Sequence, residues 1–395
     1  MLKKAAERVF KNRPEIFSDF GLDLEQNLEK WKDGMAEFYP LLLERELVYR
    51  MWGGQRIATW LQSPQPYPTH IGETWEVFDT NRIRNGALAG QTLAEATRHY
   101  GAQLIGTRAF ERYGADFPLL IKFIDANEKL SLQVHPDDTY AHQYEAATGF
   151  HGKTEAWYLL DAAPNATIIS GLKEPMEPYS FLAAVNQHSL ENLVQSVAVQ
   201  TGDLIFTPPG TLHAINEGLL IFEVQQKSDL TYRVYDYGRR DPATGQLRKL
   251  HLGKALAVLN YKSPFNPKTT PLALEPDQQR MLLVACEHFA LELWVLSQKR
   301  GLFTNPASLM ILTLIEGELQ LAWGNESLTL QHGDSVVLPA MLGVYHLAPL
   351  TATCRFLRVY IPDLERGFVT MLQRQGVSQE EISRVVFHST PLESR

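Results

Sequence analysis

The chain has 395 residues, of which 45% are hydrophobic and 21% charged, as is typical of a folded protein with about two or three domains. Its formal net charge of −8 argues against general affinity for nucleic acid or anionic membranes. No apolar run approaches the roughly 20 residues of a membrane-spanning helix and the N-terminus has no signal-peptide core, so we expect a cytoplasmic protein with no nucleic-acid or membrane partner.

The first part of the chain changes character near residue 39. Residues 1–38 are predicted to form a helical N-terminal extension, because apolar residues recur there at three- and four-residue spacing. Residues 39–262 contain short apolar runs separated by glycine and proline, which indicate strands. We expect one β domain over this range, with helical insertions that include 92–113 and 178–195.

The segment 130–135 is a predicted strand with an unexpected polar face. Alternation puts Ser131, Gln133 and His135 on one face and three apolar residues on the other. A polar face on a strand between buried strands needs a reason, and a site in the mouth of a β-barrel provides one.

A second block of short strands with glycine turns runs over 281–361 and predicts another jelly roll. Segments 202–208 and 333–339 both read Gly-Asp, four mostly apolar residues and Pro, which predicts the same barrel type for both blocks. The second copy has no histidine at the offset where His213 follows the first, so we expect this domain to be metal-free. Residues 362–395 are predicted to form a C-terminal helical tail.

Residues from separate predicted strands form a candidate metal site. The site has one amide oxygen, two imidazoles and one carboxylate, supplied by Gln133, His135, His213 and Glu155. This donor set suits a divalent metal of the zinc type with room for a water or substrate. A lone histidine is usually structural, but several matching motifs in the right strand context rarely coincide.

The sequence around these residues resembles the type I phosphomannose isomerases in their short bacterial, two-cupin form. The matching segments are 130–136 (LSLQVHP), 152–157 (GKTEAW), 209–214 (PGTLHA) and 228–233 (SDLTYR). The resemblance implies a mainly β fold of two cupin (jelly-roll) barrels with helical insertions and helical extensions at both ends. It implies one Zn²⁺ per chain and the interconversion of mannose 6-phosphate, a phosphorylated hexose, with fructose 6-phosphate through an enediol.

The resemblance also assigns roles to individual residues. It implies four zinc ligands: Gln133, His135, Glu155 and His213. It implies four catalytic residues: Arg233, Glu223, Lys153 and Asp229. Glu223, Lys153 and Asp229 are the three that could transfer the proton. It implies three residues that hold the substrate phosphate: Ser131, Lys122 and Arg239. The loop after Arg233 reads VYDYGR, whereas longer family members have AG-x-TPK there.

Two rival functions stay open on the sequence alone. An iron-dependent cupin oxygenase would use two histidines and one carboxylate, and the glutamine ligand with Lys122, Arg233 and Arg239 favours the isomerase instead. A non-catalytic sugar-binding cupin would keep the pocket, and retention of Glu223 and Lys153 disfavours it. The sequence leaves the oligomeric state undetermined.

Overall fold

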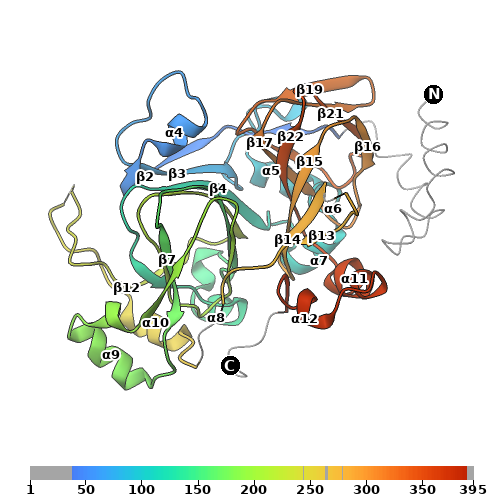
Figure 1. The fold of residues 1–395 in the computed structure, drawn as a ribbon. Coiled ribbons are helices and arrows are strands. Elements are labelled where there is room, and N and C mark those ends of the chain that lie inside the picture. The colour runs from blue at the N-terminus through green and yellow to red at the C-terminus, as the bar shows by residue number, and fades with distance from the viewer. Residues whose placement is uncertain (1–37, 243, 263–265, 278, 389–395) are drawn as a thin grey trace. The chain divides into compact units, whose positions relative to one another are not determined.

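The structure is a computed structural model, and it describes residues 38–242, 244–262, 266–277 and 279–388 (Figure 1). The helices predicted within 1–38 therefore fall almost wholly outside the described residues. The described chain is mainly β, as predicted, with its strands in four sheets. No helix in these ranges is long and apolar enough to cross a membrane.

The chain divides into two compact units, each built on two sheets. The first unit contains residues 45–78 and 119–269. The second unit contains the described residues of 38–44, 79–118 and 270–388. These units differ from the predicted domain limits, because 79–118 was expected in the first domain and groups with the second unit.

The first unit has an antiparallel six-stranded sheet facing a five-stranded one. The larger sheet has the order β2 (Glu46–Gly54), β3 (Ile71–Val77), β4 (Leu119–Ala126), β11 (Leu219–Gln226), β6 (Glu155–Ala162) and β9 (Leu204–Thr207). The smaller has the order β12 (Tyr232–Tyr235), β5 (Leu132–Val134), β10 (His213–Ile215), β7 (Thr167–Leu172) and β8 (Val194–Ala198). One apolar cluster joins the sheets, since it takes Ile124 and Ile205 from the first and Ile168 and Ile215 from the second.

Helices cover the outer face of the five-stranded sheet and so decide which face of β5 is polar. Helices α9 (Pro178–Asn186) and α10 (Leu252–Val258) lie beside this sheet (Figure 1). Their apolar residues belong to the same core cluster as Leu132 and Val134. Because side chains alternate along a strand, Gln133 between them faces the opposite side, towards the interior between the sheets. Apolar residues on the covered face therefore turn the predicted polar face of 130–135 inwards. The remaining helices of this unit are α4 (Arg56–Trp60) and α8 (Asp138–Tyr144).

The second unit repeats the strand order of the first. Its larger sheet has the order β1 (Leu41–Leu42), β20 (Ser335–Leu338), β17 (Met310–Glu316), β22 (Cys354–Tyr360), β15 (Ala290–Leu296), β14 (Arg280–Cys286) and β13 (Leu272–Ala273). Its smaller sheet has the order β16 (Arg300–Phe303), β21 (Val344–Pro349), β18 (Leu319–Trp323) and β19 (Glu326–Leu330). The Gly-Asp…Pro repeat falls on β9 and β20, which hold the same place in their sheets.

The helical segments of the second unit are shorter than predicted. The expected helix over 92–113 is three helices, α5 (Leu93–Tyr100), α6 (Ala102–Ile105) and α7 (Thr107–Tyr113), broken at two glycines with positive φ, Gly101 and Gly106. The tail has a π-helical turn (Glu365–Val369), α11 (Thr370–Arg374) and α12 (Gln379–Ile382). Ser378 caps α12, because its hydroxyl accepts a hydrogen bond from the backbone N–H of Glu381. The tail is not wholly helical, because β23 (Val386–Phe387) adds to β14 in parallel.

A buried carboxylate stabilises the second unit. Glu292 of β15 is fully buried and accepts two hydrogen bonds from Arg280, at 2.8 and 2.9 Å, and one each from Trp294 and Tyr360. Although burial opposes ionisation, Arg280 and Arg358 hold the pKa of Glu292 at about 2. Its ionised form therefore contributes stability above its ordinary pKa of 4.5, and this contribution is lost as the pH falls towards 2.

We expect Glu292→Gln to lower the free energy of unfolding by roughly 3 kcal/mol at pH 7, because it leaves buried guanidinium groups without their counter-charge. The exposed Glu326→Gln on β19 is the matched control and should have almost no effect. Urea unfolding at pH 7 and pH 3 measures both variants. The deficit of Glu292→Gln should shrink at pH 3, and an equal deficit at the two pH values would contradict this role of the charge.

Candidate metal centre and substrate cavity

The strand register explains how the candidate site residues meet between the sheets of the first unit. Across the five-stranded sheet, Gln133 of β5 pairs with His213 of β10 on one side and Arg233 of β12 on the other. Across the six-stranded sheet, Glu223 of β11 pairs with Lys122 of β4. Each sheet thus presents a row of polar side chains.

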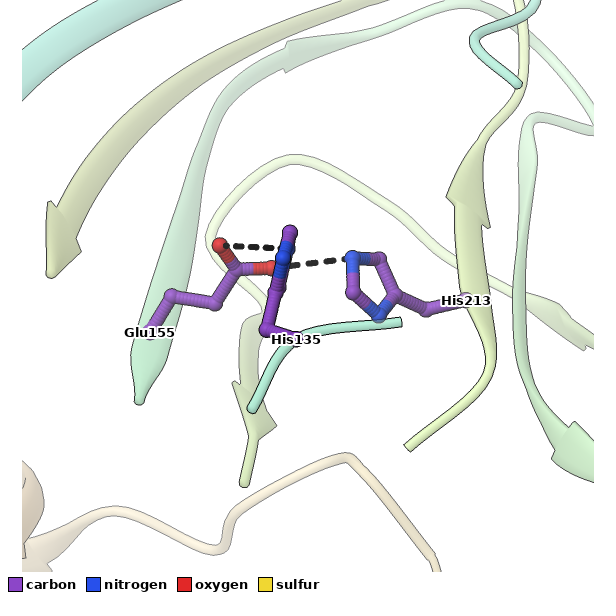
Figure 2. A group of neighbouring side chains, drawn as sticks. All are labelled: His135, Glu155 and His213. Atoms are coloured by element: carbon purple, nitrogen blue, oxygen red, sulfur yellow. Dashed lines mark ion pairs between the residues drawn. The ribbon is translucent and has the colours of Figure 1, made fainter. Parts of the chain in front are cut away.

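Three predicted ligands come together at one point. The ligand atoms of His135, Glu155 and His213 all lie within 4.8 Å of one another, and all three residues are buried. One carboxylate oxygen of Glu155 lies 3.2 Å from Nε2 of His213, and the other lies 3.5 Å from Nε2 of His135 (Figure 2). In the described ranges this is the one group of such residues close enough to hold a metal ion.

The protein backbone fixes both imidazoles for ligation. Nδ1 of His135 lies 2.7 Å from the Leu230 carbonyl, and Nδ1 of His213 lies 2.8 Å from the Thr211 carbonyl. Each Nδ1–H therefore donates to a carbonyl and leaves the Nε2 lone pair directed at the site. Burial lowers the pKa of His135 well below its usual value and that of His213 to about 4, so both rings are neutral, as metal ligands must be.

The remaining donors also fit a divalent metal. The side-chain amide nitrogen of Gln133 lies 3.3 Å from Nε2 of His213, and turning the amide over would present its oxygen to the same point. Both Glu155 oxygens are buried without a hydrogen-bond partner among the described residues, although the Lys153 ammonium lies 2.7 Å from one of them. Burial, reinforced by nearby Glu223, raises the pKa of Glu155. A dication would supply the missing partner and favour the ionised carboxylate.

A cavity of about 330 Å³ opens beside these donors. Its wall includes seven of the predicted site residues: Lys122, Ser131, Gln133, Lys153, Glu223, Asp229 and Arg233. Its volume lies within the range typical of small-molecule sites. The cavity therefore joins the predicted metal end to the predicted catalytic residues.

Lys122 lies between two carboxylates. Its ammonium is 2.8 Å from Glu223 and 3.6 Å from Glu73, and it is almost fully buried. The other oxygen of Glu223 accepts a hydrogen bond from the indole N–H of Trp157 at 2.9 Å. Although burial opposes ionisation, Lys122 and Lys153 lower the pKa of Glu223. The charge of Lys122 is thus balanced within the protein, unlike that of a lysine reserved for a substrate phosphate.

The two arginines predicted from the sequence have different surroundings. Arg233 donates to the Ser131 hydroxyl at 3.2 Å and to the Lys249 carbonyl at 3.0 Å, and it pairs with no described carboxylate. Arg239 pairs with Asp236, donates to a backbone carbonyl, and does not belong to the cavity wall. The structure therefore brings Arg233 to the cavity and keeps Arg239 from it.

Three charged residues on the cavity wall were assigned no role from the sequence: Arg50, Glu73 and Arg248. Glu73 belongs to the segment 72–76 (GETWE), which resembles an opening motif of the type I phosphomannose isomerases, so it could have been found. Arg50 accompanies it, because it donates to both oxygens of Glu73 at 2.9 and 3.1 Å. Arg248 follows Arg233 by fifteen positions, and the only sequence feature that pointed to a role for it is the presence of basic residues nearby.

The second unit has different side chains at the matching positions. Thr207 and Leu338 both precede the proline of the repeat; Thr207 pairs with Glu155, and Leu338 pairs with Met310. Met310 therefore takes the place of the anionic ligand, and the Tyr345 hydroxyl lies 3.8 Å from its sulfur. The second unit therefore has a thioether and a phenol where the first unit has metal donors.

Comparisons with known proteins agree over both units. Residues 41–165 match the family described as phosphomannose isomerase type I, catalytic domain, and 279–361 match mannose-6-phosphate isomerase, cupin domain. The chain is 35% identical over 313 residues to mannose-6-phosphate isomerase ManA of Bacillus subtilis (strain 168), covering 78% of this chain and 95% of that protein. It is 34% identical to mannose-6-phosphate isomerase of Streptococcus mutans serotype c, covering 77% and 93%.

Comparisons with solved structures agree with these sequence matches. The mannose 6-phosphate isomerase structure from Bacillus subtilis has a TM-score of 0.70 and 29% identity, and the match covers 81% of this chain and 99% of that one. A zinc-bound mannose 6-phosphate isomerase has a TM-score of 0.64 and 19% identity, covering 82% and 99%, which is a likeness of fold.

Proposed function

Because the chain belongs to the type I phosphomannose isomerase family, we propose that it interconverts mannose 6-phosphate and fructose 6-phosphate in the cavity of the first unit. One observation carries the proposal: His135, Glu155 and His213 converge next to Gln133, which lines a cavity that also holds proton-transfer groups and arginines. One Zn²⁺ per chain would be held by four residues: Gln133, His135, Glu155 and His213.

The reaction moves a proton between C1 and C2 of the sugar through an enediol that carries negative charge on oxygen. Zn²⁺ held by these four residues would supply a Lewis acid that stabilises this charge. Glu223, Asp229 and Lys153 are the cavity residues that can take up or return the proton. Lys122 keeps Glu223 ionised and Trp157 fixes the direction of its carboxylate, so we assign Lys122 a positioning role.

Arg233 completes the proposed machinery. It sits beside Gln133 in the strand register and has no carboxylate partner among the described residues, so its charge is available to the substrate. A fixed guanidinium beside the C1–C2 region can stabilise the enediolate or a neighbouring sugar oxygen.

We propose that both units are cupin barrels and that only the first is catalytic. Their strand orders match, but Arg358 pairs with Glu292 in the second unit where Glu223 pairs with Lys122 in the first. With Met310 at the carboxylate position, the second unit would serve structure. A cytoplasmic location and the lack of nucleic-acid partners stay predictions from composition.

The test is a coupled assay in which fructose 6-phosphate formation from mannose 6-phosphate is measured before and after chelation. We expect turnover that a chelator abolishes and Zn²⁺ restores. Oxygen uptake that depends on iron would support the oxygenase instead. Tight sugar-phosphate binding without turnover by the zinc-loaded protein would support a binding protein.

A further inference from the structure

A guanidinium that the family resemblance did not assign faces the substrate cavity. Three arginines, Arg50, Arg233 and Arg248, belong to its wall. We infer that Arg248 is a specificity residue that recognises the phosphate group of the substrate, which is the role expected for Arg239. This inference rests on the proposed function and adds the residue that would select a phosphorylated over a neutral sugar.

The charge balance of the cavity calls for a dianion. Three of the five cations on its wall pair with carboxylates, Arg50 with Glu73, Lys122 with Glu223 and Lys153 with Glu155, which leaves two, Arg233 and Arg248, that pair with no carboxylate of the wall. A phosphomonoester carries close to two negative charges at neutral pH, which matches this excess. A neutral hexose would leave the excess charge uncompensated.

The hydrogen bonds single out Arg248 among the arginines. Arg50 is committed to Glu73 by two hydrogen bonds. Arg248 contacts Asp236 through NH1 alone, at 3.2 and 3.5 Å, and Asp236 also pairs with Arg239. Nε and NH2 of Arg248 make no hydrogen bond to a described residue, so three N–H groups remain for a ligand.

The arginines also repel one another, which an anion between them would relieve. Burial lowers the pKa of Arg248, the Asp236 carboxylate opposes this, and the charges of Arg239 and Arg50 lower the pKa further. Burial, followed by Arg248, lowers the pKa of Arg233 to about 10. This arrangement is unfavourable without a ligand and is typical of sites for phosphate, which a planar guanidinium binds with two parallel hydrogen bonds.

The spacing along the chain suits a hexose 6-phosphate. Ser131 accepts a hydrogen bond from Arg233 and lies two residues before Gln133. Two residues of extended chain span about 7 Å, close to the length of a six-carbon sugar chain. A sugar with C1 and C2 beside Gln133 and Arg233 would therefore need a second cation for its phosphate, and Arg248 is the wall arginine that is not committed to a carboxylate of the wall.

The experiment compares Arg248→Gln with Arg240→Gln, an exposed arginine of the same loop whose guanidinium contacts only the Gly245 carbonyl. We expect Arg248→Gln to raise KM for mannose 6-phosphate about 10- to 100-fold, the range for loss of a charge-assisted hydrogen bond. Its kcat should stay within a few-fold, and Arg248→Lys should restore part of the affinity. Arg240→Gln should match the wild type.

Calorimetric binding of inorganic phosphate to the zinc-loaded proteins separates the inference from the proposed function. Phosphate should bind the wild type and Arg240→Gln but bind Arg248→Gln at least tenfold more weakly, with equal zinc content and melting temperature. Unchanged phosphate affinity in Arg248→Gln, or a loss seen in Arg239→Gln instead, would overturn the inference. Phosphate binding that depends on Arg248 in a protein with no isomerase activity would reject the proposed function alone.

Discussion

Replacing His213 with alanine is expected to strip the metal and abolish nearly all isomerase activity. His213 is buried, and its Nε2 lies 3.2 Å from the Glu155 carboxylate and 3.3 Å from the Gln133 amide. Removing even an outer partner of a ligand typically weakens metal binding 10- to 100-fold, so losing a ligand should cost more than about 100-fold. The buried Glu155 would also lose a neighbour that orients it.

Zinc per chain, measured after dialysis, and turnover of mannose 6-phosphate together check this expectation. The matched control is His346→Ala in the second unit, since His346 is only partly buried and belongs to no metal-binding group among the described residues. The control should keep one zinc per chain and full activity. Retention of zinc and turnover by His213→Ala would contradict the metal site, and loss of a second tightly bound metal from His346→Ala would contradict a metal-free second unit.

The metal end of the site was accessible from the sequence because its geometry is local. Strand alternation alone puts Gln133 on the face opposite Leu132 and Val134, and the structure covers that apolar face with helices. Glu155 and His213 are the first residues of β6 and β10, so each follows a turn that the sequence marks with glycine. The family resemblance drawn from these motifs is confirmed by the relatives.

The charged end was less predictable because it depends on which side chains pair in three dimensions. Lys122 was expected to hold phosphate, yet its partner Glu223 lies about a hundred residues away and reaches it through the pairing of β4 with β11. Arg239 was expected to hold the substrate phosphate, but it pairs with Asp236 and does not belong to the cavity wall. A single sequence shows the cations but not their counter-charges.

Grouping into units also depends on contacts that periodicity does not report. Residues 79–118 interrupt the first unit in sequence but belong to the second. The backbone amides of Thr107 and Arg108 donate to the carbonyls of Pro306 and Ala307, about two hundred residues later. Amphipathic helices show that a face is buried, but they do not show against what.

The last expectation concerns Arg233→Ala, which should lower kcat about 10²- to 10³-fold, the usual cost of removing one preorganised donor to a developing oxyanion. Zinc content and stability should stay unchanged, because the Arg233 side chain hydrogen-bonds the Ser131 hydroxyl and the Lys249 carbonyl and no metal donor among the described residues. Arg233→Lys restores the charge but not the planar fork, so rescue should be partial. Steady-state kinetics beside Arg240→Ala check this. A near-normal kcat with the defect confined to KM would place Arg233 with Arg248 at the phosphate and leave enediolate stabilisation to other groups.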